Sequence, residues 1–126
     1  MHATIVAVKL SDELDDALSD AGARIRLRYP WWLRPLLLPG TVAITLGRRI
    51  YVGVEPGQEE FERLLRHELQ HVRQINKLGV FRFYSSYALE FLHNIRTGMN
   101  AREAYCNISF EREAHDAEGV RMSLDV

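Results

Sequence analysis

The chain has a single cysteine and almost no net charge. Cys106 is the only cysteine among 126 residues, so no internal disulfide forms and the core must hold without covalent cross-links. The shortage of cysteine also argues against a thiolate zinc site. Because 16 Lys and Arg residues nearly balance 17 Asp and Glu residues, the composition argues against a nucleic-acid partner.

Long hydrophobic runs are also missing. The most apolar window, residues 29–40, is interrupted by Arg34 and by prolines and is too short to span a bilayer. The first residues lack the basic start, apolar region and cleavage site of a signal peptide. We therefore expect no membrane span and a cytoplasmic protein, with export by a dedicated machine left open. The length predicts one domain over residues 1–126.

The first half of the sequence predicts short strands around one helix. An acidic amphipathic helix capped by Ser11 ends near Gly22. The β-rich or alternating segments are 4–9, 24–29, 41–46 and 50–54. The last two segments flank Gly47 and form a predicted hairpin.

The second half predicts helices. Residues 59–78 carry an apolar helical stripe, and residues 81–96 form a second helix rich in aromatic side chains. A third helical region starts after Asn100, runs through or bends near residues 107–109, and continues to about Gly119. A small sheet followed by helices is an α+β domain.

Two apolar features have a structural and a functional interpretation. The first is the segment that contains Trp31, Trp32 and residues 36–38. This segment could line a substrate site, face a membrane, or fill one end of the core, and we favour the core position. Cys106 could compete as a metal ligand, but a lone cysteine on an apolar helix is typically a small core residue.

The most informative residues are His67-Glu68-Leu69-Gln70-His71. On a helix, His67 and His71 lie on one face and can bind one zinc ion. Glu68 can take a proton from a water activated by the metal. The same helical wheel places Glu68 within the apolar arc that faces the core, where an unpartnered carboxylate is costly. A metal site explains this placement better than a solvated helix face does.

A catalytic zinc site normally has three protein ligands. Candidates downstream are His93, Glu103, Glu111, Glu113, His115 and Glu118. Glu111, His115 and Glu118 share one helical face, while Glu113 points roughly opposite. Helix geometry therefore favours Glu111 or His115 as the third ligand.

The segments LLRHELQHVRQ and NISFEREAHDAE resemble the gluzincins, especially the minimal single-domain minigluzincins. The hairpin sequence TVAITLGRRIYVG before HELQHVRQ also resembles the metallopeptidase-like domain encoded with extracellular contractile injection systems. The resemblance covers residues 41–118. It implies a minimal zincin-like fold, with His67, His71 and Glu111 as zinc ligands and Glu68 as general base. The Phe-Glu-x-x-Ala pattern identifies Glu111, three residues before Ala114.

This sequence departs from the resembled pattern at His115. Many relatives have an aspartate there, which supports a ligand histidine through a hydrogen bond. Three alternatives follow: His115 serves as the donor or an alternative ligand, Asp116 replaces the aspartate, or the site binds metal less firmly.

The implied activity is zinc-dependent peptide hydrolysis with a peptide or protein as substrate. Tyr84, Tyr87 and Tyr105 are candidate hydrogen-bond donors to the oxyanion, with Tyr105 and Tyr84 retained as catalytic candidates. Residues 41–46 or 50–54 would pair with an extended substrate as an edge strand.

Other functions stay open. One alternative is a catalytically silent zinc-binding scaffold, and another is a peptidase that is latent until it is processed. A homodimer is an open alternative to a monomer.

Overall fold

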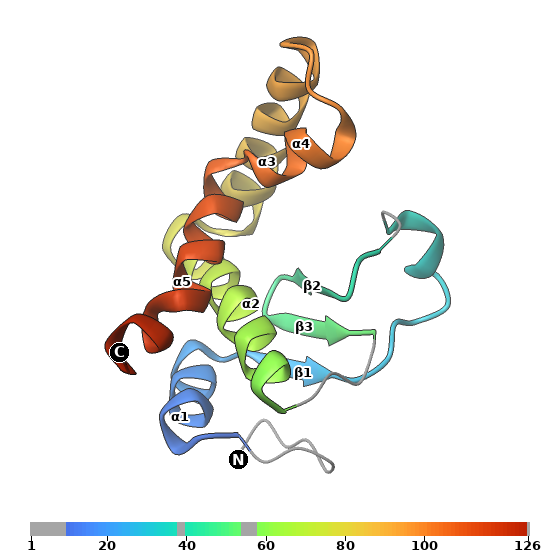
Figure 1. Cartoon of the computed structure of the whole chain (residues 1–126). Coiled ribbons are helices and arrows are strands. Elements are labelled where there is room, and N and C mark those ends of the chain that lie inside the picture. The colour runs from blue at the N-terminus through green and yellow to red at the C-terminus, as the bar shows by residue number, and fades with distance from the viewer. Residues whose placement is uncertain (1–9, 38–39, 54–57, 126) are drawn as a thin grey trace.

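The computed structural model describes residues 10–37, 40–53 and 58–125 (Figure 1). The strand predicted over residues 4–9 lies outside the described residues. A small mixed sheet lies beside helices that carry most of the remaining chain. This arrangement confirms the predicted α+β class.

The sheet has the order β1-β3-β2. Strand β1 (Arg24–Arg26) pairs in parallel with β3 (Arg49–Val52), and β2 (Ala43–Leu46) pairs with β3 in antiparallel orientation. Strands β2 and β3 form the predicted hairpin, and Gly47 takes the left-handed conformation, with φ 64°, that its turn requires. Among the described residues, β3 is central, so β2 is the one of the two predicted substrate-pairing strands that lies at an edge.

Strand β1 is shorter than predicted. The alternating pattern predicts a strand over residues 24–29, but the strand ends at Arg26. The parallel pairing with β3 stops at the Arg26–Tyr51 pair, and the chain then turns toward Pro30. Strand β3 itself ends at Val52, so the residues after Arg26 have almost no partner strand left to pair with.

Five α-helices lie in the described part of the chain. Helix α1 (Asp12–Ala21) has the predicted Ser11 cap, and Gly22 ends it with φ 75°. The other α-helices are α2 (Gln58–Leu78), α3 (Val80–Arg96), α4 (Ala101–Cys106) and α5 (Ser109–Asp125). The third predicted helical region is therefore divided between α4 and α5. Helix α5 continues through Gly119, so the prediction that it ends there is wrong.

Helix α2 organises the fold. One of its faces packs on β3 and α1, and α5 runs along another (Figure 1). The core includes Leu14, Leu18, Ile50, Val52, Phe61, Leu65, Leu69 and Val72, all of them buried. Burial of large apolar side chains is the main stabilising contribution to such a fold. The helix therefore fixes the position of His67, Glu68 and His71 relative to α5.

Two burial predictions are wrong. The side chains of Trp31, Trp32 and Leu36 are exposed, and Leu33 is the core residue of this segment. Short turns that include the 3-10 helix η1 (Arg34–Leu36) direct the tryptophans outward. Cys106 is also exposed, because Ala104 and Ile108 take the inward positions next to it.

Within residues 10–37, 40–53 and 58–125, no helix combines the length and the hydropathy that a bilayer crossing requires.

Candidate metal centre

Helices α2 and α5 bring His67, His71 and Glu111 together. His67 Nε2 lies 2.9 Å from Glu111 Oε1, and His71 Nε2 lies 3.1 Å from Glu111 Oε2. Within the described ranges, these residues form the one His/Cys/Asp/Glu group whose ligand atoms all lie within 4.8 Å of one another. The three side chains are largely buried. Two imidazole nitrogens and a carboxylate are a typical donor set for catalytic zinc.

The other nitrogen of each imidazole has its own partner. His67 Nδ1 lies 2.6 Å from Glu118 Oε2, and His71 Nδ1 lies 2.9 Å from Gln74 Oε1. The Gln74 amide nitrogen donates to Glu113 Oε1 at 2.7 Å, so its oxygen faces His71 and accepts from Nδ1–H. With Nδ1–H bonded in this way, Nε2 is the nitrogen that faces the cluster, and its lone pair would bind a metal there once it gives up its proton.

Two observations indicate that the cluster of His67, His71 and Glu111 fits a metal ion. His71 Nε2 is buried and makes no hydrogen bond to any described residue, despite its proximity to Glu111. A buried polar atom without a partner is costly, and a bound cation would satisfy it. Ligand atoms around one tetrahedral zinc lie about 3.3 Å apart. The observed nitrogen–oxygen separations of 2.9 and 3.1 Å are close to that value.

The electrostatics of the cluster follow from its burial. Burial acts to lower the pKa of His67, but Glu111, Glu68 and Glu118 outweigh it and raise the pKa to about 9. The pKa of His71 is raised for the same kind of reason. Burial alone would raise the pKa of Glu111, but the two imidazoles hold it well below its usual range. A metal ion would therefore displace protons from the imidazoles and meet an ionised carboxylate.

Glu68 lies beside this cluster but is not part of it. Its side chain is buried, as the helical wheel predicts. Thr45 on β2 donates a hydrogen bond from Oγ1 to Glu68 Oε1 at 2.6 Å. One carboxylate oxygen is therefore held by the edge strand, and the side chain is fixed next to the possible metal ligands.

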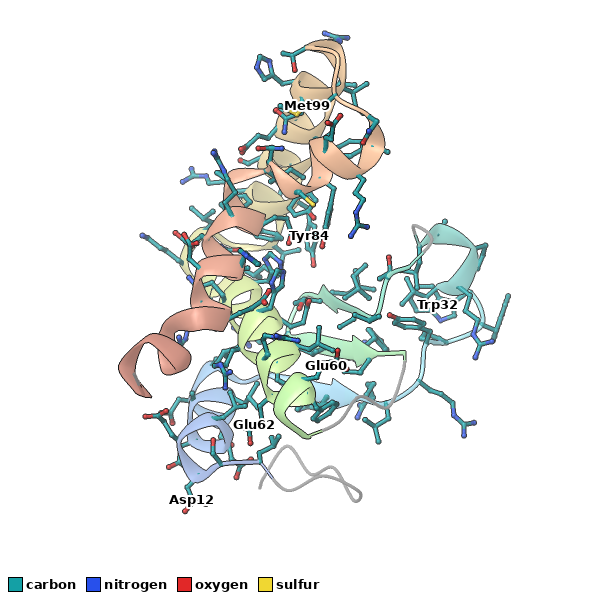
Figure 2. All side chains as sticks on the ribbon, in the orientation of Figure 1. Asp12, Trp32, Glu60, Glu62, Tyr84 and Met99 are labelled. Carbon is teal, nitrogen blue, oxygen red and sulfur yellow. The ribbon has the colours of Figure 1, made fainter. Side chains whose placement is uncertain are left out.

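The tyrosine candidates differ in their contacts. Tyr87 donates to Glu111 Oε2 at 2.5 Å. Burial raises the pKa of Tyr105, and the carboxylates of Glu111 and Glu68 raise it further, so its hydroxyl stays protonated. Tyr84 reaches from α3 to the β2–β3 hairpin (Figure 2), donating to the Thr45 carbonyl and accepting from the Gly47 amide. Its only O–H is therefore engaged away from the cluster.

The remaining sequence candidates lie outside the cluster. His115 is 78% exposed, and its Nδ1 is 3.4 Å from Glu118 Oε2. Asp116, His93, Glu103 and Glu113 are also exposed. Glu118 takes the supporting position for which His115 and Asp116 were considered.

Sequence reasoning placed Glu118 on the correct helical face but did not assign it this role. It missed Thr45 and Gln74 altogether. Thr45 was detectable in principle as an inward-facing polar residue on a predicted edge strand. The bond of Gln74 to His71 depends on its i+3 position, which the sequence also displays.

The contact of Glu118 with His67 leads to a prediction about metal affinity. Glu118→Gln is expected to weaken zinc binding by about 10–100-fold, because a neutral amide cannot polarise His67 as the carboxylate does, even where its oxygen still accepts the Nδ1–H bond. His115→Ala is the matched control on the same helix face and should change the affinity little. Competition with a zinc-chelating indicator measures both. Equal affinities for wild type and Glu118→Gln would exclude this role.

Comparison with known proteins gives one match. A family model described as the eCIS core domain matches residues 38–78. The matched segment contains β2, β3 and α2, and hence His67, Glu68 and His71, but it ends before Glu111. Neither curated proteins nor solved structures match the chain. The family match is consistent with the metallopeptidase-like domain that the sequence resembles.

Proposed function

We propose that this chain is a zinc-dependent metallopeptidase. The observation that carries the proposal is the position of Glu68. A buried carboxylate lies beside the cluster of His67, His71 and Glu111, outside the possible ligand set, and is oriented by Thr45. A base next to a metal site is the arrangement that hydrolysis by an activated water needs.

The chain's own residues have distinct roles in this proposal. His67, His71 and Glu111 hold the metal, which when bound supplies Lewis-acid activation of water and of the scissile carbonyl. Glu68 takes a proton from the attacking water and delivers it to the leaving amine. Tyr87 orients Glu111 through its hydrogen bond. Tyr105 donates a hydrogen bond to the oxyanion.

The edge position of β2 supports a peptide as substrate. Among the described residues, no strand pairs with the outer side of β2, and such an edge can pair with an extended peptide through main-chain hydrogen bonds. Thr45 belongs to this strand and contacts Glu68. A peptide added alongside β2 would therefore lie on the strand that also positions the base.

The match to the eCIS core domain is compatible with a peptidase-like module. The matched residues include the hairpin and the helix that carries both histidines. The match does not extend to α5, so the assignment of Glu111 rests on the cluster geometry and on the resemblance of its helix to the gluzincin pattern.

The direct test is digestion of a peptide library by the full chain loaded with zinc. We expect cleavage that stops when a chelator removes the metal and returns when zinc is restored. Protein with bound zinc that cleaves no peptide would contradict the proposed activity and favour a silent zinc-binding scaffold.

Thr45 provides a second test of the same mechanism. Thr45→Val keeps the side-chain shape but removes the hydroxyl that holds Glu68. We expect kcat to fall by about tenfold or more. General acid–base catalysis accelerates a reaction by about 10²–10⁴-fold, and a misplaced base loses part of that acceleration. Thr45→Ser should restore most of the activity. If the valine and serine variants have equal kcat values, the hydroxyl does not position the base.

A further inference from the structure

The part of the chain that runs from the end of α1 through β3 has an unusual composition. Residues 21–54 contain no aspartate or glutamate, and their basic residues are Arg24, Arg26, Arg28, Arg34, Arg48 and Arg49. All six arginine side chains are exposed. In the described residues, none of them forms an ion pair with a carboxylate, and Arg48 bonds to Asn76. In a chain of net charge −1, residues 21–54 therefore carry only positive charge.

Exposed apolar side chains lie on the segment that carries two of these arginines, Arg28 and Arg34. We call residues 27–37 the tryptophan arm. Trp31 is 84% exposed and Leu36 is 74% exposed, and Leu27 and Trp32 are exposed as well. Figure 2 shows Trp32 on this arm, far from α5. Solvent exposure of several large apolar side chains on one short segment is unfavourable in water and marks an interaction surface.

The arm has a defined shape. Leu33 anchors it in the core with 3% exposure, and backbone bonds link Leu33 to Pro30 and Leu36 to Leu33. At its base, Tyr29 donates to the Thr41 carbonyl at 3.2 Å. Gly53 leaves room for the Tyr29 ring, because an added Cβ would lie 2.2 Å from it. The tryptophans are thus held outward by turns around a buried anchor.

We propose that the tryptophan arm docks the protein on the surface of an anionic lipid bilayer. Tryptophan is favoured at membrane interfaces, where its ring is partly apolar and its N–H remains hydrated. Leu27 and Leu36 would enter the acyl boundary beside the tryptophans. Arg28 and Arg34, which lie on the arm itself, would contact lipid phosphates and carboxylates in the headgroup region.

The charge distribution favours this occupant and its orientation. Acidic residues gather on α1, which lies across the sheet from the arm in Figure 1. An anionic surface would therefore attract the arm and repel the opposite side of the molecule. A nucleic acid would use the arginines and could stack on the tryptophans, but it offers no apolar environment for exposed leucines. A lipid surface accounts for both the arginines and the exposed apolar side chains.

The two tryptophans of the arm are the only ones in the chain, so tryptophan fluorescence reports on the arm alone. The full-length protein is mixed with vesicles of phosphatidylcholine, with or without phosphatidylserine. We expect co-sedimentation and a blue shift of the emission only with the phosphatidylserine vesicles, and quenching by lipids brominated in their acyl chains.

Variants test the contributions of the arginines and of the tryptophans separately. Arg28→Glu with Arg34→Glu should weaken vesicle binding at least about 25-fold, as each basic residue near an anionic membrane contributes about fivefold. Trp31→Ala should weaken binding at least about tenfold, with Trp32 retained as the probe. Matched controls are Arg96→Glu with Arg102→Glu, and Phe81→Ala, whose side chain is 86% exposed on α3.

The proposal is overturned by any of three results. The wild-type protein shows no blue shift with anionic vesicles, the control variants weaken binding as much as the arm variants, or an oligonucleotide shifts the emission while the vesicles do not. None of these measurements depends on metal binding or peptide hydrolysis, so the docking surface and the proposed activity fail independently.

Discussion

Glu68→Gln is expected to reduce peptide hydrolysis by about 10²–10⁴-fold while the protein keeps its metal and its fold. Glutamine has nearly the same size as glutamate, and its amide oxygen can accept the Thr45 hydrogen bond that Glu68 Oε1 accepts at 2.6 Å. It cannot take a proton from water. The variant therefore removes the base and leaves the surrounding contacts in place.

The measurement combines initial rates on a cleaved peptide with the zinc content and melting temperature of each protein. Unchanged zinc and an unchanged melting temperature make the rate loss specific to proton transfer. A Glu68→Gln variant that cleaves at the wild-type rate would show that another group is the base. Because Glu68 lies outside the cluster, loss of zinc from this variant would contradict the assignment of the ligands.

Glu111→Ala is expected to weaken zinc binding by more than about 100-fold, since even the loss of a supporting hydrogen bond typically costs about 10–100-fold. Glu111 is the carboxylate that faces both His67 Nε2 and His71 Nε2. Its removal leaves two imidazoles as the only protein ligands. Two ligands fall short of the three that a catalytic zinc site normally has.

His115→Ala is the matched control for this prediction. Its side chain is exposed on the same helix and lies outside the cluster, so we expect nearly wild-type zinc affinity. Titration with a competing chelator measures both variants. The reverse result, with metal lost from His115→Ala and kept by Glu111→Ala, would make His115 the third ligand.

Much of the candidate site follows from local periodicity. The spacing of His67 and His71 is readable because a helix places residues four apart on one face. The burial of Glu68 follows from the same wheel, and it is confirmed. Helical periodicity limits the candidates for the third ligand to Glu111 or His115. The resemblance to the gluzincins favours Glu111. The structure brings that residue to both histidines.

Contacts between distant segments could not be predicted in this way. Thr45 is 23 residues from Glu68, and Glu118 is 51 residues from His67. Each pairing depends on how α2 packs against β2 and α5. The burial of Trp31 and Trp32 was predicted from their apolar character, but turns around Leu33 direct them outward. Hydrophobicity alone does not distinguish a core residue from an interaction surface.

X-ray absorption spectroscopy of the zinc-loaded protein tests the central claim most directly. The cluster of His67, His71 and Glu111 predicts one zinc ion per chain. It also predicts nitrogen and oxygen ligands at about 2.0–2.2 Å, with the multiple-scattering signature of two imidazoles. A zinc–sulfur distance of about 2.3 Å would identify Cys106 as a ligand. That result, or a chain that retains no zinc, would contradict the proposed metal centre.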